Sequence, residues 1–92
     1  MSQKIGYIRV SSKNQNLDRQ LEVMGKHNVE KIFQEKVSAR DTNREQLKEL
    51  LKYVREKDVV YVESYSRLAR STSDFLRLLD QFNNKGVGLY IR

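Results

Sequence analysis

Four short apolar runs, separated by segments with a helical period, set the strongest limit on how this chain can fold. The runs are rich in Val, Ile and Tyr, and they cover residues 4–10, 31–33, 58–62 and 87–91. Strands that alternate with helices form a mainly parallel sheet, because right-handed crossovers place successive strands in the same direction. The sequence therefore predicts an α/β fold with a largely parallel four-stranded sheet and flanking helices.

Three apolar stripes with a helical period lie between these runs. Their members are Leu17, Leu21 and Met24; Leu47, Leu50, Leu51 and Val54; and Phe75, Leu78, Leu79 and Phe82. The spacing predicts three amphipathic helices whose apolar sides pack on the sheet. The start signals are Asn16 before the first stripe, Thr42 three residues before Glu45, and Ser71 three residues before Asp74. Gly86 is expected to end the third helix.

Composition excludes several classes of function. The chain has 92 residues and 38% hydrophobic content, enough for one modest core. It has no cysteine, so disulfides and cysteine-ligated metal sites are excluded, and its one histidine, His27, gives little material for a metal cluster. We expect His27 to be an exposed surface residue rather than part of a catalytic triad. The sequence also lacks a Walker A loop, a G-x-G-x-x-G loop and an H-E-x-x-H motif.

The charge balance and the N-terminus indicate a location and a class of partner. Lys and Arg number 18 against 12 Asp and Glu, which gives a net charge of +6 and suggests an anionic partner such as nucleic acid. The excess is spread along the chain, so a solvated surface of mixed charge explains it equally well. No apolar run is long enough for a membrane span or a signal peptide, and we expect a cytoplasmic protein.

Arginine and serine dominate the predicted loops at the carboxyl ends of the strands, where parallel sheets bind ligands. The predicted loops cover residues 11–16, 35–43 and 63–71. At or near them lie Arg9, Ser11, Ser38, Arg40, Arg44, Arg67 and Arg70. Guanidinium groups around a serine hydroxyl suit a phosphoryl group that the hydroxyl attacks, and they can neutralise charge as metal ions do elsewhere. The alternative is that Ser11 is an ordinary turn residue and the arginines are solvated.

The order of these residues resembles the motif series of one enzyme family. The series consists of YIRVS at 7–11, NLDRQ at 16–20, EKVS at 35–38, Arg44, and SRLARS at 66–71. It is similar to that of the serine recombinases, the family of resolvases and DNA invertases. The match runs in order over nearly the whole chain and joins several separated motifs, which makes it highly specific.

The resemblance implies both a mechanism and a set of site residues. Ser11 would attack a phosphodiester of double-stranded DNA, forming a 5′-phosphoserine link and a free 3′-hydroxyl for strand exchange and religation. Arg9, Arg67 and Arg70 would bind and polarise the scissile phosphate. The residues expected to contact DNA, or to organise the site around it, are Tyr7, Gln15, Gln20, Ser38 and Arg44. Neither ATP, a divalent metal nor another cofactor is implied.

Two departures from the family pattern change these expectations. Many relatives have aspartate where this chain has Ser66, so the resemblance assigns no general acid. Relatives also continue into a long dimer helix and a DNA-binding module. We therefore expect residues 1–92 to be one truncated catalytic domain of a protein that forms homodimers and tetramers. By itself this piece is expected to be an inactive monomer.

Two other functions remain open from the sequence. A receiver-like or nucleotide-binding α/β module would share the topology, although receiver domains need acidic residues where this chain has Ser11, Ser66 and Arg67. A degenerate recombinase relative could bind DNA or phosphate without cutting, and Ser66 leaves that alternative open.

Overall fold

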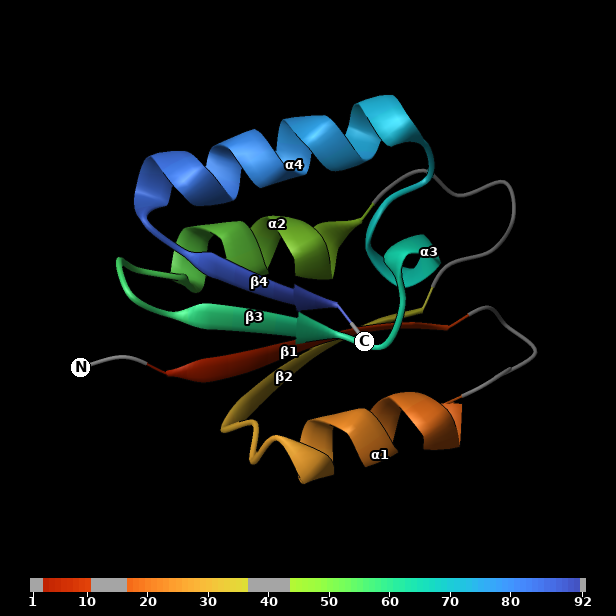
Figure 1. The fold of residues 1–92 in the computed structure, drawn as a ribbon. Helices are drawn as coiled ribbons and strands as arrows, with labels where there is room; N and C mark the ends of the chain where they lie inside the picture. Colours follow the sequence, from red (N-terminus) through yellow and green to blue (C-terminus); the bar gives the residue numbers. More distant parts are fainter. Residues whose placement is uncertain (1–2, 11–16, 37–43, 92) are drawn as a thin grey trace.

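The computed structural model describes residues 3–10, 17–36 and 44–91, with the side chain of Arg67 excepted. The elements are β1 (Lys4–Val10), α1 (Leu17–Lys26), β2 (Lys31–Lys36), α2 (Glu45–Tyr53), β3 (Val59–Val62), α3 (Tyr65–Leu68), α4 (Thr72–Lys85) and β4 (Gly88–Ile91). Figure 1 shows a layered molecule with α1 on one face of the sheet and α2 and α4 on the other.

The four strands form one parallel sheet in the order β2-β1-β3-β4, which confirms the predicted fold class. The chain moves from β1 to β2 in one direction, and then passes back across β1 to reach β3 and β4. Right-handed crossovers in opposite directions place their helices on opposite faces. This explains why α1 lies alone on its face (Figure 1).

The side chains of β1 alternate between two apolar layers. Ile5 and Tyr7 belong to the larger core cluster, which includes residues of α2 and α4. Ile8 and Val10 pack instead with Met24 of α1. Gly6 permits this close packing, because a Cβ at position 6 would collide with the Met24 side chain. The period-two alternation therefore places Arg9 on the same face as Tyr7.

The segments at the carboxyl ends of β2 and β3 differ from the prediction. Strand β2 continues to Lys36, so Glu35 and Lys36 are not loop residues. Glu35 is in phase with Phe33, and its buried carboxylate is bonded inside the fold. The predicted 63–71 loop contains the one-turn helix α3, which is too short to show an apolar period.

The predicted helix boundaries are partly right. Ser71 caps α4, since its Oγ accepts a hydrogen bond from the Asp74 N–H at 3.1 Å, and Gly86 ends that helix with a φ of 73°. The expected start near Thr42 is wrong, because α2 begins at Glu45 with Arg44 in the N-cap position. Asn16 lies outside the described residues.

One expectation for α1 and one for the residue that follows it are also wrong. Leu21 is 42% exposed although it belongs to the predicted stripe, and Gln20 is fully buried in its place. His27 is half-buried, with its ring centroid 5.0 Å from that of Tyr61 and 4.6 Å from that of Tyr90. Because α1 covers only part of its face, this ring lies over the strands beyond the helix. Among the described residues, no helix has the length and apolar character to cross a membrane.

Candidate active site

The strand order places a topological switch point at the carboxyl edge of the sheet, between β1 and β3. Connections leave the carboxyl ends of β1 and β3 toward opposite faces, and ligands of parallel sheets bind at such a switch point. The segment after β1 begins with Ser11, and the segment after β3 contains α3 and the predicted phosphate ligands Arg67 and Arg70. Figure 1 shows α3 at this edge, beyond the end of β3.

Arg9 connects the end of β1 to the segment that follows β3. Its Nη2 donates a hydrogen bond of 2.5 Å to the carbonyl oxygen of Ser66, which is 57 positions further along the chain. Arg9 is the second-last residue of β1, and Ser66 is in α3. The side chain of a predicted phosphate ligand therefore reaches the segment that carries the two other predicted ligands.

Gln20 fixes the backbone of Arg9. The Arg9 N–H donates to Gln20 Oε1 at 3.0 Å, and Gln20 Nε2 donates to the Arg9 carbonyl at 3.2 Å. The pairing of β1 with β3 extends only to Gly6, so the backbone beyond it needs another partner on that side. The buried amide of Gln20 supplies both a donor and an acceptor, which holds Arg9 in register.

Arg44 also connects to the segment after β3. Its Nη1 donates to the Leu68 carbonyl at 2.7 Å, and its Nη2 donates to both Asp74 carboxylate oxygens at 3.0 and 2.9 Å. The Arg44 residue is only 8% exposed. Its guanidinium group therefore holds α3 against the start of α4 and is not exposed on the protein surface.

Tyr7 and Glu35 form a buried pair behind Arg9. The Tyr7 hydroxyl lies 3.4 Å from Glu35 Oε1, the oxygen that also accepts a 3.1 Å hydrogen bond from the Leu47 N–H. Burial raises the pKa of Tyr7 well above its ordinary value, and the negative charge of Glu35 raises it further. The hydroxyl is therefore neutral at physiological pH and can donate its proton to the carboxylate.

The structure describes some of the predicted site residues but not others. Ser11, Gln15 and Ser38 lie outside the described residues, as does the side chain of Arg67. Arg70 is exposed and borders a hollow of about 260 Å³ together with Arg44 and other residues of α2 and α4. The side chains of Tyr7 and Gln20 are fully buried, so in this structure they support the site from behind and do not reach its surface.

Comparison with known proteins identifies the family. Residues 4–92 match the family model described as "Resolvase, N terminal domain". The chain belongs to the resolvase family of serine recombinases. The similar proteins include the transposon Tn501 resolvase of Pseudomonas aeruginosa, 49% identical over 84 residues, and the transposon Tn1546 resolvase of Enterococcus faecium, 43% identical over 86 residues. A resolvase of Clostridium perfringens is 38% identical over 87 residues.

These matches cover most of this chain but less than half the length of each relative. They span 91%, 94% and 92% of this chain, against 44%, 45% and 46% of the three relatives. The predicted resemblance to serine recombinases is confirmed, and a receiver-like module is excluded. The roles of individual residues in the site stay predictions.

Two carboxylates at the site of the resolvase domain were not assigned a role from the sequence. Glu35 belongs to the EKVS motif, and its alternation with Phe33 was the available signal for burial. Asp74 was recognised only as part of a helix start, although it binds Arg44 and Arg77 and accepts a hydrogen bond from the Arg70 N–H. The contact with Arg77 has the local i, i+3 spacing of a helix, but no local pattern marks the contact with Arg44, which is 30 positions away.

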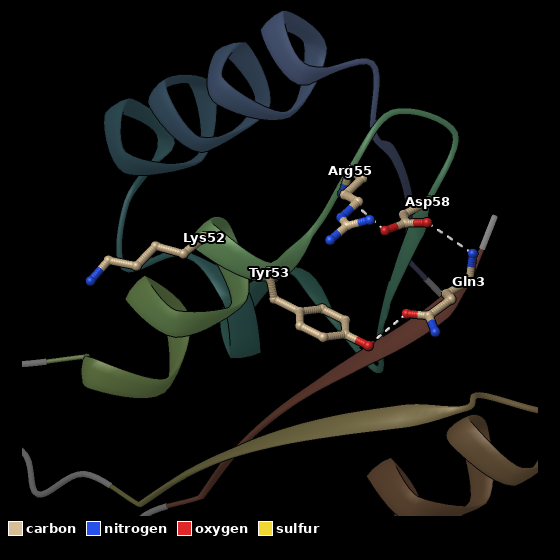
Figure 2. Close-up of a pocket in the computed structure, with 5 residues that line it drawn as sticks. All are labelled: Gln3, Lys52, Tyr53, Arg55 and Asp58. Carbon is tan, nitrogen blue, oxygen red and sulfur yellow. Dashed lines mark hydrogen bonds between the residues drawn. The ribbon is translucent and has the colours of Figure 1, made fainter. Parts of the chain in front are cut away.

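A hollow of about 530 Å³ lies away from this site. It is lined by Gln3, Lys52, Tyr53, Arg55 and Asp58, near the amino ends of β1 and β3 (Figure 2). The Tyr53 hydroxyl donates to Gln3 Oε1 at 2.7 Å, and the Gln3 N–H donates to Asp58 Oδ1 at 2.8 Å. These bonds connect the start of the sheet to the end of α2, which indicates a structural role.

Proposed function

We propose that this resolvase domain cuts and rejoins DNA through a covalent serine intermediate. The Ser11 Oγ attacks the phosphorus of a phosphodiester, a bond forms between Oγ and phosphorus, and the bond from phosphorus to the 3′-oxygen breaks. The hydroxyl proton passes to solvent, and the departing 3′-oxygen takes up a proton. The 5′-phosphoserine link keeps the phosphodiester energy, so that reversal of the attack reseals the DNA.

The hydrogen bond between Arg9 and the Ser66 carbonyl is the observation that carries this proposal. It brings the strand that leads into Ser11 beside the segment of Arg67 and Arg70. Charge on the phosphoryl oxygens rises during the attack, and several guanidinium groups placed together can stabilise it. We assign this role to Arg9, Arg67 and Arg70, with Gln15 and Ser38 at the border of the same site.

Buried residues support the cationic groups. Gln20 fixes the Arg9 backbone, Arg44 holds the carbonyl of Leu68, and Tyr7 is buried on the face of β1 that also carries Arg9. The arrangement supports DNA cleavage that depends on arginine charge rather than on a metal ion or another cofactor. We propose that residues 1–92 form the catalytic domain, and that the whole protein acts on double-stranded DNA in the cytoplasm as a homodimer and tetramer.

Trapping of the covalent intermediate tests this proposal. A hybrid recombinase, in which this chain replaces the matching residues of the Tn501 resolvase, is incubated with a nicked DNA substrate that prevents religation. We expect a protein–DNA adduct that Ser11→Ala abolishes, while DNA affinity changes by less than a few-fold. The matched control is Ser73→Ala, which removes an exposed hydroxyl from α4 and is expected to keep the adduct.

The same assay separates the alternatives. An adduct that persists in Ser11→Ala ends the assignment of the nucleophile. Binding of DNA with no adduct from the unmodified hybrid supports a degenerate, non-cutting relative, for which Ser66 in place of the common aspartate is the motivating residue. Replacement of Arg9 or Arg70 by Ala is expected to slow cleavage by about 10²-fold, the typical effect of losing one charge-stabilising group.

A further inference from the structure

Asp74 is the most densely bonded carboxylate at the candidate site. It lies in the first turn of α4 and is only 6% exposed. Its two oxygens accept hydrogen bonds from the Arg44 guanidinium, from Arg77 Nη2 at 2.7 Å and from the Arg70 N–H at 3.0 Å. The start of α4, the backbone just before it and the distant side chain of Arg44 therefore meet at one carboxylate.

Two of these bonds reach the segment of the predicted phosphate ligands. The first is direct, because the donor is the backbone N–H of Arg70. The second passes through Arg44, which binds Asp74 with Nη2 and the Leu68 carbonyl with Nη1. Leu68 and Arg70 follow Arg67 within three residues, so Asp74 constrains the backbone on the C-terminal side of Arg67.

The groups around Asp74 also favour a negatively charged carboxylate at this position. Arg44 is nearly buried, and a buried guanidinium without a counter-charge carries a large desolvation cost. A carboxylate in the first turn of a helix is further favoured by the helix dipole. An amide at this position retains one acceptor atom but loses the charge and one of the two acceptors.

We propose that Asp74 is a positioning residue for DNA cleavage, which holds the 67–70 segment so that its arginines meet the scissile phosphate. The inference rests on the proposed function. It assigns Asp74 no contact with DNA, and its effect passes through the Arg70 N–H and through Arg44. A shift of about 1 Å at a reacting group can reduce a rate by about 10²-fold. We therefore expect a defect in cleavage rate rather than in DNA binding.

Single-turnover cleavage by the hybrid recombinase tests this inference with Asp74→Asn. The readouts are the rate constant at saturating DNA, the fraction of protein that forms adduct, and the dissociation constant for DNA. All are measured well below the melting temperature of each variant. Asp80→Asn removes an exposed carboxylate from the same helix, and Ser71→Ala weakens the start of α4 without removing the counter-charge of Arg44.

A positioning role predicts that Asp74→Asn lowers the rate constant by about 10- to 100-fold, with a dissociation constant within about threefold of the starting value. Asp80→Asn and Ser71→Ala should keep the full rate constant. A merely structural role would instead lower the fraction of active protein and leave the rate constant of the remainder unchanged. A rate constant within threefold of the unsubstituted hybrid overturns the inference.

A second variant keeps the test decisive if Asp74→Asn does not fold. Asp74→Glu retains the counter-charge for Arg44 but displaces the carboxylate by one methylene group. It is expected to fold and to cleave at least tenfold more slowly, whereas an unchanged rate constant would overturn the inference. The Ser11 assay distinguishes failure of the positioning role from failure of the proposed function. If the unsubstituted hybrid cleaves through Ser11 and both Asp74 variants cleave normally, only the positioning role fails.

Discussion

Gln20 replaces a strand partner at the end of β1. Its side chain is fully buried and bonds both the N–H and the carbonyl of Arg9, beyond the last residue that pairs with β3. A buried amide is costly unless its donor and acceptor groups are bonded, and here both are. Gln20 therefore stabilises the end of β1 and also fixes the position of Arg9, a predicted phosphate ligand.

Replacement of Gln20 by Leu should lower the free energy of unfolding by about 1–3 kcal/mol, because the buried backbone groups of Arg9 lose their partners. Urea unfolding of the chain measures this change. The neighbouring substitution Leu21→Ala is the control, since Leu21 is 42% exposed and its loss should change stability by less than about 0.5 kcal/mol. Equal effects of the two substitutions would refute the role of the Gln20 amide.

Asp74 gives the stability a specific dependence on pH. Burial alone would raise the pKa of Asp74, but hydrogen bonds from the Arg70 N–H, Arg77 and Arg44 outweigh it and lower the pKa below its ordinary value. A lowered pKa in the folded state stabilises the fold above the ordinary aspartate pKa of about 4. This contribution disappears as the pH falls through the lowered value.

The stability difference between the unsubstituted chain and Asp74→Asn should therefore be constant from neutral pH down to about pH 5, and should shrink below about pH 4. Unfolding by urea at a series of pH values measures it. A difference that shrinks between pH 7 and pH 5 would contradict the lowered pKa. Asp80→Asn, on the exposed side of α4, provides the comparison.

Two glycines, one at the end of α4 and one inside α1, should respond in opposite ways to replacement by alanine. Gly86 ends α4 with a φ of 73°, and a Cβ there would lie 2.9 Å from Glu56 Cγ. Gly25 lies inside α1, exposed, and a Cβ at that position would point into open space. The first glycine is required by the backbone conformation, and the second only weakens its helix.

Gly86→Ala should destabilise the chain by about 1–2 kcal/mol, because a left-handed conformation is costly for a residue with a Cβ. Gly25→Ala should stabilise it by about 0.5–1 kcal/mol through helix propensity. Thermal unfolding monitored by circular dichroism compares the two variants with the unsubstituted chain. A melting temperature of Gly86→Ala equal to or above that of the unsubstituted chain would show that the end of α4 does not depend on the glycine.

The elements were predictable wherever packing leaves a local pattern. The Val- and Ile-rich strands and the apolar stripes follow from burial on the two faces of a sheet, and the Ser71 and Gly86 signals mark the two ends of α4 correctly. Helix α3 was missed because one turn has no period. The start of α2 was misplaced because Arg44 takes the N-cap position through contacts with α3 and α4, which no nearby residue indicates.

At the scale of the whole molecule, the family and the sheet follow from the sequence, but the contacts of the site do not. The motif series identified the family, since it preserves the order and spacing of the family's motifs. The bonds from Arg9 to Ser66 and from Arg44 to Asp74 depend on how β1, α2, α3 and α4 meet in space. Only a three-dimensional structure reveals such long-range polar contacts.

The isolated 92-residue chain should be a monomer in dilute solution and should not recombine DNA. Its large exposed apolar side chains include Ile32 on β2, Leu76 on α4 and Tyr90 on β4, so they lie on different elements. Stable oligomers generally need a continuous interface of about 1,000 Å² or more. Light scattering measures the mass, and a stable dimer or tetramer, or recombination by this chain alone, would refute the prediction.

The order of the strands also governs when the site can exist during synthesis. Arg9 and Ser66 meet only after the chain has passed from β2 back across β1 and laid down β3. A ribosome-bound chain that has emerged only through β2 would therefore hold Ser11, the proposed nucleophile, and Arg9 without Arg67 and Arg70. Under the proposed mechanism, DNA cleavage by a growing chain would have to wait until β3 and α3 have been made.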